Sequence, residues 1–499
     1  MTSEPADLAA RAARTHVVVI GGGIGGLVAA RECAKVGMRV TLLEQGGSLG
    51  GAIRRAELDG VVLDAGAESY ATRGGQVRAL LAELGLTERI VSPEGGGAWL
   101  AGIPGVGAAP LPVGGILGIP ANPFQDDVRR IIGWSGAWRA YLDRVRPPLT
   151  IGHSHSLGKL VSSRMGRAVR DRLVAPVTTG VYSASPEDVD VDVAAPGLNA
   201  ALTSVGSLSG AVQVLRDQAA ARGAKAPGAA VEGLDGGMSV LVDALASDIV
   251  TLGGVIRTGE TATAIVSDAQ GWRVTVLRPD ETGDGEEDAV VDSAETAEIA
   301  ADAVIVATAE PTARALLAAV APGLAETTPA SAPEIEIVTL LLDAPALDAA
   351  PRGSGVLTVP GSSTAKALTH SSIKWGWVRA AAGGRHVVRV SFGAQGEPAA
   401  TAGLADDEAA ELALREASGL LGIPLRADAL LATHRSRFVQ SQPASIIGSG
   451  ERRAAARAAV RAVPGLAAVG AWLAGTGLAQ VVPDAKDEAD RLRRALLWD

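Results

Sequence analysis

Cysteine and aromatic residues are scarce in this 499-residue chain, and each shortage excludes a class of protein. The single cysteine, Cys33, excludes an internal disulfide framework and is typical of a reducing compartment. Aromatic residues make up only 3% of the chain, which argues against base-stacking surfaces, so we expect no nucleic-acid partner. Hydrophobic residues at 47% and charged residues at 20% are typical of a globular protein, and the length allows several domains.

No segment is suited to export or to crossing a bilayer. Residues 1–16 are polar and include acids, unlike a signal peptide. The longest charge-free stretch, residues 95–125, holds five prolines and repeated glycines, which a lipid-exposed helix does not tolerate. We expect a soluble, cytoplasmic protein with at most peripheral membrane contact.

Negative charge is concentrated in one short segment. The formal net charge is −10, and residues 280–302 contain ten acidic residues and no lysine or arginine, so the rest of the chain is balanced. Such a run predicts a solvated hairpin loop between two strands. Residues 129–172, by contrast, contain ten basic residues against two acidic ones.

A glycine-rich turn near the N-terminus predicts a dinucleotide-binding site. A β-branched strand, residues 16–20, runs into GGGIGG, which a helix to about residue 36 and a second strand, residues 39–43, follow. The three glycines of the GxGxxG spacing allow a tight turn, close approach of a pyrophosphate, and close packing of helix on strand. The helix N-terminus attracts phosphates, and an acid after the second strand can bind ribose. The predicted contacts are Gly21, Gly22, Gly23, Ile24, Gly25, Gly26, Glu44 and Gln45.

Two further turns resemble those of the large flavoprotein family that includes amine oxidases, phytoene desaturases and porphyrinogen oxidases. A glycine pair, Gly50-Gly51, follows Glu44, and a DxG loop (residues 64–69, DAGAES) follows a short hairpin. The resemblance implies FAD rather than NAD, with the DxG loop near the isoalloxazine, although Ser48 stands where the family usually has Arg or Lys. The additional cofactor contacts it implies are Gly50, Gly51, Ala65, Gly66, Ala67, Glu68, Ala262, Thr308, Gly470, Gly475, Thr476 and Gly477.

The same resemblance implies an α/β fold (α+β overall) in three parts. We expect a long helix over residues 406–421, a terminal helix over residues 484–496, and strands that include residues 334–342 and 386–392. The predicted parts are a discontinuous Rossmann-type FAD-binding domain (14–98, 230–312 and 450–499), a mixed-sheet substrate-binding domain (99–120 and 313–449) and a helical insertion (121–229).

Three stretches resemble the protoporphyrinogen and coproporphyrinogen oxidases in particular. These are residues 111–120 (LPVGGILGIP), 156–183 and 366–375 (KALTHSSIKW), and the resemblance extends from about residue 17 to 496. No lysine occurs between Lys225 and Lys366, the region where amine oxidases have a flavin-facing lysine. The sequence departs from the family at residues 441–445 (SQPAS) and after the last glycine turn, at residues 478–481 (LAQV).

The resemblance implies oxidation of a porphyrinogen in haem biosynthesis, in three two-electron steps through the flavin, with O2 as acceptor and H2O2 as product. The arginine-rich, lysine-poor composition suggests a high-GC bacterium, for which coproporphyrinogen III is the implied substrate and coproporphyrin ferrochelatase a candidate partner. The alternatives are a protoporphyrinogen IX oxidase, another flavin amine oxidase or desaturase, and a non-catalytic FAD-binding partner of the haem pathway.

The sequence assigns no catalytic residue, and it leaves the substrate contacts open. Arg73 and Lys374 are candidates for binding propionates, although a surface role suits each equally well. His370 could face the site, although a satisfied or exposed histidine is the simpler interpretation. His153 and His155 form an HxH pair without a third ligand at workable spacing, so we predict no metal site.

One helical face contains most of the aromatic residues in the basic region. Ile131, Trp134, Trp138, Tyr141 and Val145 recur at helical spacing. Packing inside the helical insertion is the simpler prediction, and the alternative is a face that rests on anionic lipid or on a haem-pathway partner. The arginines that flank this face are Arg129, Arg130, Arg139, Arg144 and Arg146.

Overall fold

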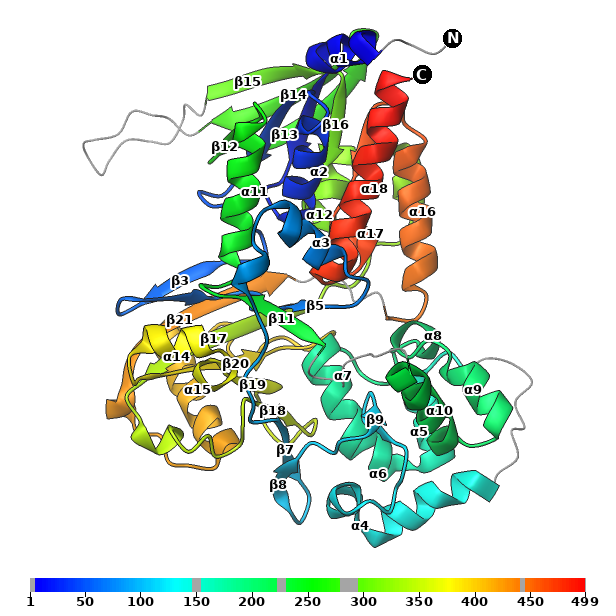
Figure 1. Ribbon diagram of the computed structural model, residues 1–499, viewed down its shortest axis with the longest axis vertical. Helices are drawn as coiled ribbons and strands as arrows, with labels where there is room; N and C mark the ends of the chain where they lie inside the picture. The colour runs from blue at the N-terminus through cyan, green and yellow to red at the C-terminus, as the bar shows by residue number, and fades with distance from the viewer. Residues whose placement is uncertain (1–4, 146–153, 222–229, 279–294, 440–444, 499) are drawn as a thin grey trace.

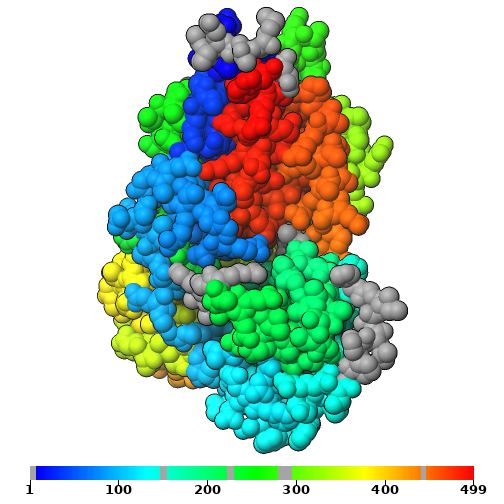
Figure 2. All heavy atoms as spheres, turned by 45° about the vertical axis from the view of Figure 1, so that its right-hand side comes forward, coloured from blue at the N-terminus to red at the C-terminus, as the bar shows by residue number. Residues whose placement is uncertain are grey.

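The computed structural model describes residues 5–145, 154–221, 230–278, 295–439 and 445–498. A part built on a parallel sheet lies at one end of the molecule, and two lobes, one built on a mixed sheet and one helical, lie at the other (Figure 1). In the space-filling view, α18 (Leu478–Leu497) and α16 (Ser449–Arg461) lie side by side on the surface of the first part, above the helical lobe (Figure 2).

A five-stranded parallel sheet forms the centre of the first part. Its order is β12 (Val255–Thr258), β2 (Arg39–Glu44), β1 (His16–Ile20), β16 (Ala303–Val306) and β22 (Leu466–Ala468), with every neighbouring pair parallel. In β1, Val17 and Val19 pack into one hydrophobic cluster, and Val18 and Ile20 pack into another on the opposite face. Apolar, β-branched residues on both faces are typical of a parallel sheet that is covered on both sides.

Helices cover one face of this sheet. α2 (Ile24–Ala34), α3 (Gln76–Glu83), α11 (Ser239–Thr251) and α18 share one hydrophobic cluster with the strands. The other face is covered by the antiparallel sheet of β13 (Thr261–Asp268), β14 (Gly271–Arg278) and β15 (Glu295–Ala301), together with α12 (Glu310–Leu317) and α16.

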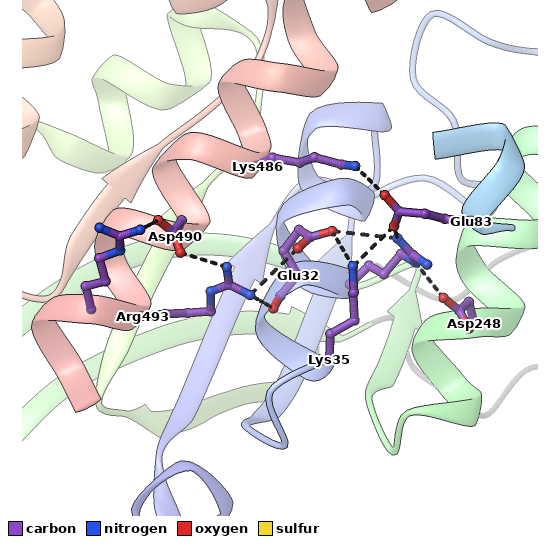
Figure 3. A network of polar contacts seen from close by, with 9 residues as sticks. Glu32, Lys35, Glu83, Asp248, Lys486, Asp490 and Arg493 are labelled. Atoms are coloured by element: carbon purple, nitrogen blue, oxygen red, sulfur yellow. Dashed lines mark hydrogen bonds and ion pairs between the residues drawn. The ribbon is translucent and has the colours of Figure 1, made fainter. Parts of the chain in front are cut away.

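Ion pairs join the helices that surround α2 (Figure 3). Arg31 of α2 donates to Glu83 of α3 at 2.7 Å and to Asp248 of α11 at 2.5 Å. Arg493 of α18 donates to the backbone carbonyl of Glu32 at 2.6 Å. Three segments that are far apart in the sequence, α3, α11 and α18, are thereby held around the helix that follows the glycine turn.

A seven-stranded mixed sheet forms the first lobe. Its order is β21 (Leu430–Val439), β17 (Glu334–Leu342), β20 (His386–Phe392), β19 (Ala367–His370), β18 (Gly355–Thr358), β7 (Ala98–Ile103) and β8 (Gly107–Pro110). The long helix α15 (Asp406–Leu421) packs on one face through a shared hydrophobic cluster. The bounds of β17, β20 and α15 agree with the predicted ranges, so these predictions are confirmed.

A hairpin connects the two sheets. β3 (Arg55–Leu58) and β4 (Val61–Asp64) pair with each other and pack into a cluster with Leu341 and Val387 of the mixed sheet. The DxG loop begins at the last residue of β4. The start of this loop is therefore fixed against the mixed sheet as well as against the first part of the molecule.

The second lobe is helical. α4 (Asp126–Tyr141), α5 (Leu157–Met165), α7 (Ala175–Tyr182), α9 (Leu198–Val205) and α10 (Leu208–Ala221) lie in it, around a cluster that also includes Leu100 of β7. Among the described residues, no single helix is long and apolar enough to cross a membrane; α9 and α10 pass that test only as a pair, and they meet at 119°.

The short elements complete the chain, apart from brief 3-10 and π turns. They are α1 (Pro5–Arg14), β5 (Tyr70–Ala71), β6 (Ile90–Val91), β9 (Gly115–Ile116), β10 (Ile119–Pro120), α6 (Arg167–Val169), α8 (Val191–Ala194), β11 (Val231–Leu234), α13 (Ser371–Lys374), α14 (Gly376–Ala382) and α17 (Ala471–Ala474).

Two predicted boundaries differ from the structure. The proposed division at residues 312/313 falls inside α12, whose Ala313, Leu316 and Leu317 pack against the parallel sheet, so this part extends further along the chain. The terminal helix begins at Leu478 rather than at residue 484. Pro483 lies in its second turn, where the missing N–H costs one hydrogen bond without ending the helix.

The aromatic face of α4 is exposed, so the prediction that it packs inside the helical lobe is wrong. Ile131 is buried, whereas Trp134 is 61% exposed and Trp138 is 56% exposed. The reason is Gly133, whose φ of 73° and ψ of 172° break the helix and reorient the residues after it. The face also includes Phe124, whose ring lies 5.0 Å from that of Trp138.

The acidic run was predicted to form a loop between two strands. The strands on either side of it, β14 and β15, are antiparallel neighbours, as that prediction requires. Residues 279–294, which hold most of the acids, lie outside the described residues.

Candidate functional site

The glycine turn between β1 and α2 is shaped by close contacts of its own backbone. A Cβ on Gly26 would lie 2.0 Å from the Gly21 carbonyl oxygen, and one on Gly21 would lie 2.8 Å from the Ala307 carbonyl oxygen. Gly23 differs, because a Cβ there would meet no protein atom nearer than the Gly51 Cα at 4.0 Å. Gly21 and Gly26 must be glycines because the backbone packs closely there. Gly23, in contrast, borders a space that protein atoms leave open for a ligand.

This open space lies at the N-terminus of α2. No side chain caps that helix, so its first N–H groups are available to an anion. The glycine pair lies beside it, because Gly50 donates its N–H to the Gly22 carbonyl at 2.8 Å and forms a parallel bridge with Gly23. Two glycine-rich turns therefore meet where the sequence predicts a pyrophosphate.

Glu44 lies at the end of β2 beside the same turn. Its carboxylate accepts from the N–H of Gly22 at 2.7 Å and from that of Gly46 at 2.8 Å. Each carboxylate oxygen has a second lone pair, so the group can still accept from a ribose diol. Gln45 is exposed. Ala262, the second residue of β13, lies two residues after Glu260, whose N–H donates to the Glu44 carbonyl at 3.1 Å.

The DxG loop is held by its own backbone and by α11. Gly66 has no room for a side chain, since a Cβ would lie 2.0 Å from the Ala52 carbonyl oxygen. The N–H of Ala67 donates to that same carbonyl at 3.0 Å. The Asp64 carboxylate accepts from the N–H of Met238 at 3.0 Å, and burial raises the pKa of Asp64 to about 6.

An ion cluster fixes the end of this loop. Glu68 pairs with Lys374 at 2.6 Å and with Arg389 at 2.9 Å. Although burial opposes ionisation, the two cations hold the pKa of Glu68 down at about 2. Lys374, a predicted propionate contact, is therefore engaged with Glu68, and the structure does not present it as a free cation.

Arg389 was missed by sequence reasoning. Besides pairing with Glu68, its Nη2 donates to the carbonyls of Ala65 at 3.2 Å and Gly66 at 2.5 Å. It is the one arginine in the strand HVVRVSF, with valine on both sides of it, and a charged residue in such an apolar run was the available signal.

The C-terminal segment closes the site from another side. A Cβ on Gly25 would lie 3.3 Å from Gly470, and one on Gly21 would lie 3.1 Å from the N of Thr308. Gly475 and Gly477 have φ of 97° and 99°, and they flank Thr476 just before α18 begins without a side-chain cap. The structure thus brings Thr308 and Gly470 beside the glycine turn at the N-terminal end of α2.

Arg73 is exposed next to this C-terminal turn. The Gln480 amide, oriented to satisfy its neighbours, accepts from Arg73 Nη2 at 3.2 Å and donates to the Ala474 carbonyl at 3.1 Å. Gln480 lies in the segment that departs from the family sequence. It connects Arg73 to Ala474, the residue directly before the glycine turn at residues 475–477. Arg73 therefore remains a candidate for a substrate contact.

The histidines show no catalytic arrangement among the described residues. His370 is fully buried, and its Nε2 lies 3.1 Å from Nδ1 of His386, which in turn contacts Asp348 at 3.1 Å. His155 can approach Asp190 and Asp192 with ligand atoms within 4.8 Å of one another, but Asp190 is already used as the N-cap of α8. His153 lies outside the described residues.

The residues present fit a dinucleotide. Uncapped helix N-termini, a glycine turn with open space above Gly23, and an acid at the ribose position occur together at the carboxyl edge of a parallel sheet. The fold and the site thus define a Rossmann-type dinucleotide-binding protein.

The chain belongs to the flavin containing amine oxidoreductase family, whose model matches residues 24–493, and it is an oxidoreductase with a flavin cofactor. It is 32% identical over 470 residues to a coproporphyrinogen III oxidase from Mycobacterium tuberculosis (strain ATCC 25618 / H37Rv), covering 92% of this chain and 93% of that one. A coproporphyrinogen III oxidase from Bacillus subtilis (strain 168) is 30% identical over 176 residues, 34% of this chain and 37% of that one. The resemblance to porphyrinogen oxidases is confirmed.

Solved structures show the same fold. A protein from Exiguobacterium sp. 255-15 described as a protoporphyrinogen oxidase superposes with a TM-score of 0.79 at 23% identity, covering 96% of this chain and 99% of that one. A reduced UDP-galactopyranose mutase superposes with a TM-score of 0.65 at 14% identity, covering 97% and 94%. The predicted α/β fold is confirmed.

Proposed function

We propose that this protein is an FAD-dependent oxidase that converts coproporphyrinogen III to coproporphyrin III in haem biosynthesis. The observation with most weight is its 32% identity, across 92% of the chain, with a coproporphyrinogen III oxidase. The glycine turns and Glu44 support a dinucleotide flavin, because flavin mononucleotide has neither the pyrophosphate nor the adenosine ribose for them to bind.

Four groups of residues hold FAD in this proposal. The turn at residues 21–26 and Gly50-Gly51 bind the pyrophosphate, Glu44 binds the adenosine ribose, and Ala262 lies near the adenine. The DxG loop, with Thr308, Gly470 and the turn at residues 475–477, surrounds the flavin ring. Arg389 and Lys374 position this loop through Glu68, and we assign neither of them to substrate.

The overall reaction removes six electrons and six protons from the porphyrinogen, reduces three O2 and forms three H2O2. The flavin supplies the redox chemistry: it accepts two electrons at a time from the substrate and passes them to O2. The protein must hold an uncharged macrocycle with anionic propionates, and Arg73 beside the C-terminal turn supplies a cation for one of them.

Turnover of the purified protein tests the proposal. Loaded with FAD in air, it should convert coproporphyrinogen III to a fluorescent porphyrin well above the non-enzymatic rate, with peroxide formed. Faster conversion of protoporphyrinogen IX would favour the first alternative, a protoporphyrinogen IX oxidase. A bound flavin that oxidises neither compound would contradict the proposal and favour another flavin oxidase or a non-catalytic partner.

We further propose that the aromatic face of the helical lobe contacts anionic lipid. Arg129 stacks over Trp134 at 4.4 Å and Arg144 over Tyr141 at 5.5 Å, so cations and aromatic rings share one exposed surface. Such a surface suits the headgroup region of a membrane. Arg139 is not part of it, because it donates to carbonyls of Ser163 and Arg164, and Arg146 lies outside the described residues. A ferrochelatase that receives the product is the alternative occupant.

A further inference from the structure

Lys366 lies immediately before β19 and has no counter-charge among the residues that the structure describes. Its Nζ donates to Ser183 Oγ at 2.6 Å, and no carboxylate in the part of the chain that the structure describes lies within ion-pairing distance. Lys35, Lys374 and Lys486, in contrast, each pair with a glutamate.

The surroundings make this charge costly in the absence of a ligand. Desolvation lowers the pKa of Lys366 to about 7, although part of the side chain remains accessible to solvent. An ammonium kept in such a place without an ion pair is typical of a binding site. A carboxylate ligand would supply the missing counter-charge.

Ser183, the partner of Lys366, ends α7 in a left-handed conformation. Its φ of 54° and ψ of 31° are left-handed, a region that glycine occupies without strain and other residues seldom adopt. It ends α7 and is buried, and its hydroxyl is the group that Lys366 reaches. A serine at this position provides a hydrogen-bonding partner that glycine could not.

The position of Lys366 connects it to the candidate site. Tyr182 precedes Ser183, and the Arg73 guanidinium is close enough to oppose the rise that burial causes in the pKa of Tyr182. Arg73 in turn contacts Gln480 beside the C-terminal glycine turn. The C-terminal turn, Gln480 and Arg73 therefore lie on the side of Tyr182, the residue that precedes Ser183.

A cleft is present at the same junction. Gln395, whose backbone N–H donates to the Ser183 carbonyl at 2.8 Å, lines a cleft of about 340 Å³ together with Asp188, Ser331 and Arg452. The side-chain oxygen of Gln395 is buried without a hydrogen-bond partner in the described structure. Lys366 does not itself line this cleft; the two are connected through Ser183, whose hydroxyl accepts from Lys366 and whose carbonyl accepts from Gln395.

We propose that Lys366 binds a carboxylate of the substrate and thereby selects a porphyrinogen that has a propionate, rather than a vinyl group, at that position. Coproporphyrinogen III has four propionates, whereas protoporphyrinogen IX has two and carries vinyl groups in place of the others. A vinyl group would leave the ammonium without a counter-charge. Sites that are built for a polar group reject analogues that lack it. This inference rests on the proposed function and names the residue that decides between the two substrates.

The first test is the variant Lys366→Met, which keeps the length of the side chain and removes the charge. We expect kcat/KM for coproporphyrinogen III to fall about 100-fold, mainly through KM, while the value for protoporphyrinogen IX changes little. Lys366→Arg should recover part of the loss, and Lys159→Met, at an exposed lysine of α5, should have no effect. An equal fall for both substrates, or none for either, would overturn the inference.

A second test does not depend on turnover. With its lowered pKa, Lys366 should react with acetic anhydride faster than the exposed lysines at about pH 8, as followed by mass spectrometry. Coproporphyrin III should protect it, and the tetramethyl ester of coproporphyrin, which lacks carboxylates, should not. Absence of protection would overturn the inference even if the protein oxidises porphyrinogens. Protection without any turnover would keep the carboxylate site and contradict only the proposed function.

Discussion

Arg389 in the mixed sheet lies 2.9 Å from the carboxylate of Glu68, 321 residues earlier in the chain. Through the same guanidinium it holds the carbonyls of Ala65 and Gly66, so one side chain fixes both the backbone and the charge of the DxG loop. The lobe that is proposed to bind substrate thereby positions the loop that is proposed to face the flavin.

Removing that guanidinium should loosen the flavin. In Arg389→Met, Glu68 keeps one cation, Lys374, and the Ser371 hydroxyl that donates to it at 3.1 Å. Breaking a buried ion pair costs about 3 kcal/mol, and if that cost falls on the flavin-bound loop, the flavin affinity weakens roughly 100-fold. Flavin retained after desalting, read from its absorbance, measures the effect.

The matched control is Arg379→Met. Arg379 pairs with Glu94, but both side chains are about half exposed, and such pairs contribute at most about 1 kcal/mol. Full flavin retention in both variants would show that Arg389 does not position the loop.

Two neighbouring glycines should respond to alanine in opposite ways. In Gly23→Ala, the nearest protein atom to the new methyl group is the Gly51 Cα at 4.0 Å. The apoprotein should therefore fold with unchanged stability but bind FAD weakly. In Gly26→Ala, the methyl group would lie 2.0 Å from a backbone oxygen, so the apoprotein itself should be destabilised by about 3 kcal/mol. Thermal unfolding of the apoproteins and FAD titration separate the two effects. Normal FAD affinity in Gly23→Ala would contradict the assignment of this turn to the pyrophosphate.

The buried histidine pair predicts acid sensitivity. Burial, with His386 as a lesser cause, lowers the pKa of His370 to about 3, whereas the unfolded chain takes up the proton near 6.5. The unfolded state therefore binds more protons below pH 6.5, and stability is lost as the pH falls, by about 1.4 kcal/mol per pH unit for this residue.

The variant His370→Asn should reduce this slope. Urea midpoints followed by tryptophan fluorescence at about pH 7 and pH 5 measure it, and Trp375 in the same buried region reports on the lobe. His155→Asn, at an exposed histidine, serves as the control and should keep the full slope. Equal slopes in all three proteins would mean that other groups govern acid unfolding.

The aromatic face should matter for lipid binding and not for folding. The double variant Trp134→Ala/Trp138→Ala changes exposed side chains, so its stability should stay within about 0.5 kcal/mol of the original. Its binding to phosphatidylglycerol vesicles should fall sharply, and the original protein should bind less at high salt. Trp498→Ala, an exposed tryptophan at the end of α18, should bind vesicles normally. If the original protein ignores these vesicles, the lipid proposal fails.

Local sequence was enough to predict the parts of the site that lie on single turns. The strand, glycine turn and acid at residues 16–44 form one continuous βα unit, and the spacing of its residues determines their geometry. The helix α15 was predictable for a similar reason, since acids at its start and a glycine at its end mark both termini.

Contacts between distant segments could not be predicted in this way. Nothing in the sequence near Lys374 indicates that it pairs with Glu68, because the two residues meet only when the mixed sheet packs on the hairpin. Helical spacing also failed at Gly133, since periodicity assumes an unbroken helix and the single glycine turned Trp134 and Trp138 outward.

The most direct measurement is anaerobic mixing of the flavin-loaded protein with coproporphyrinogen III in a stopped-flow instrument. The account predicts that the absorbance of the oxidised flavin bleaches as the first two electrons leave the substrate. It should return when O2 is admitted, and porphyrin absorbance should rise only then, because one flavin takes up two of the six electrons at a time. A flavin that stays oxidised in the presence of coproporphyrinogen III would contradict the proposed function, however tightly FAD is bound.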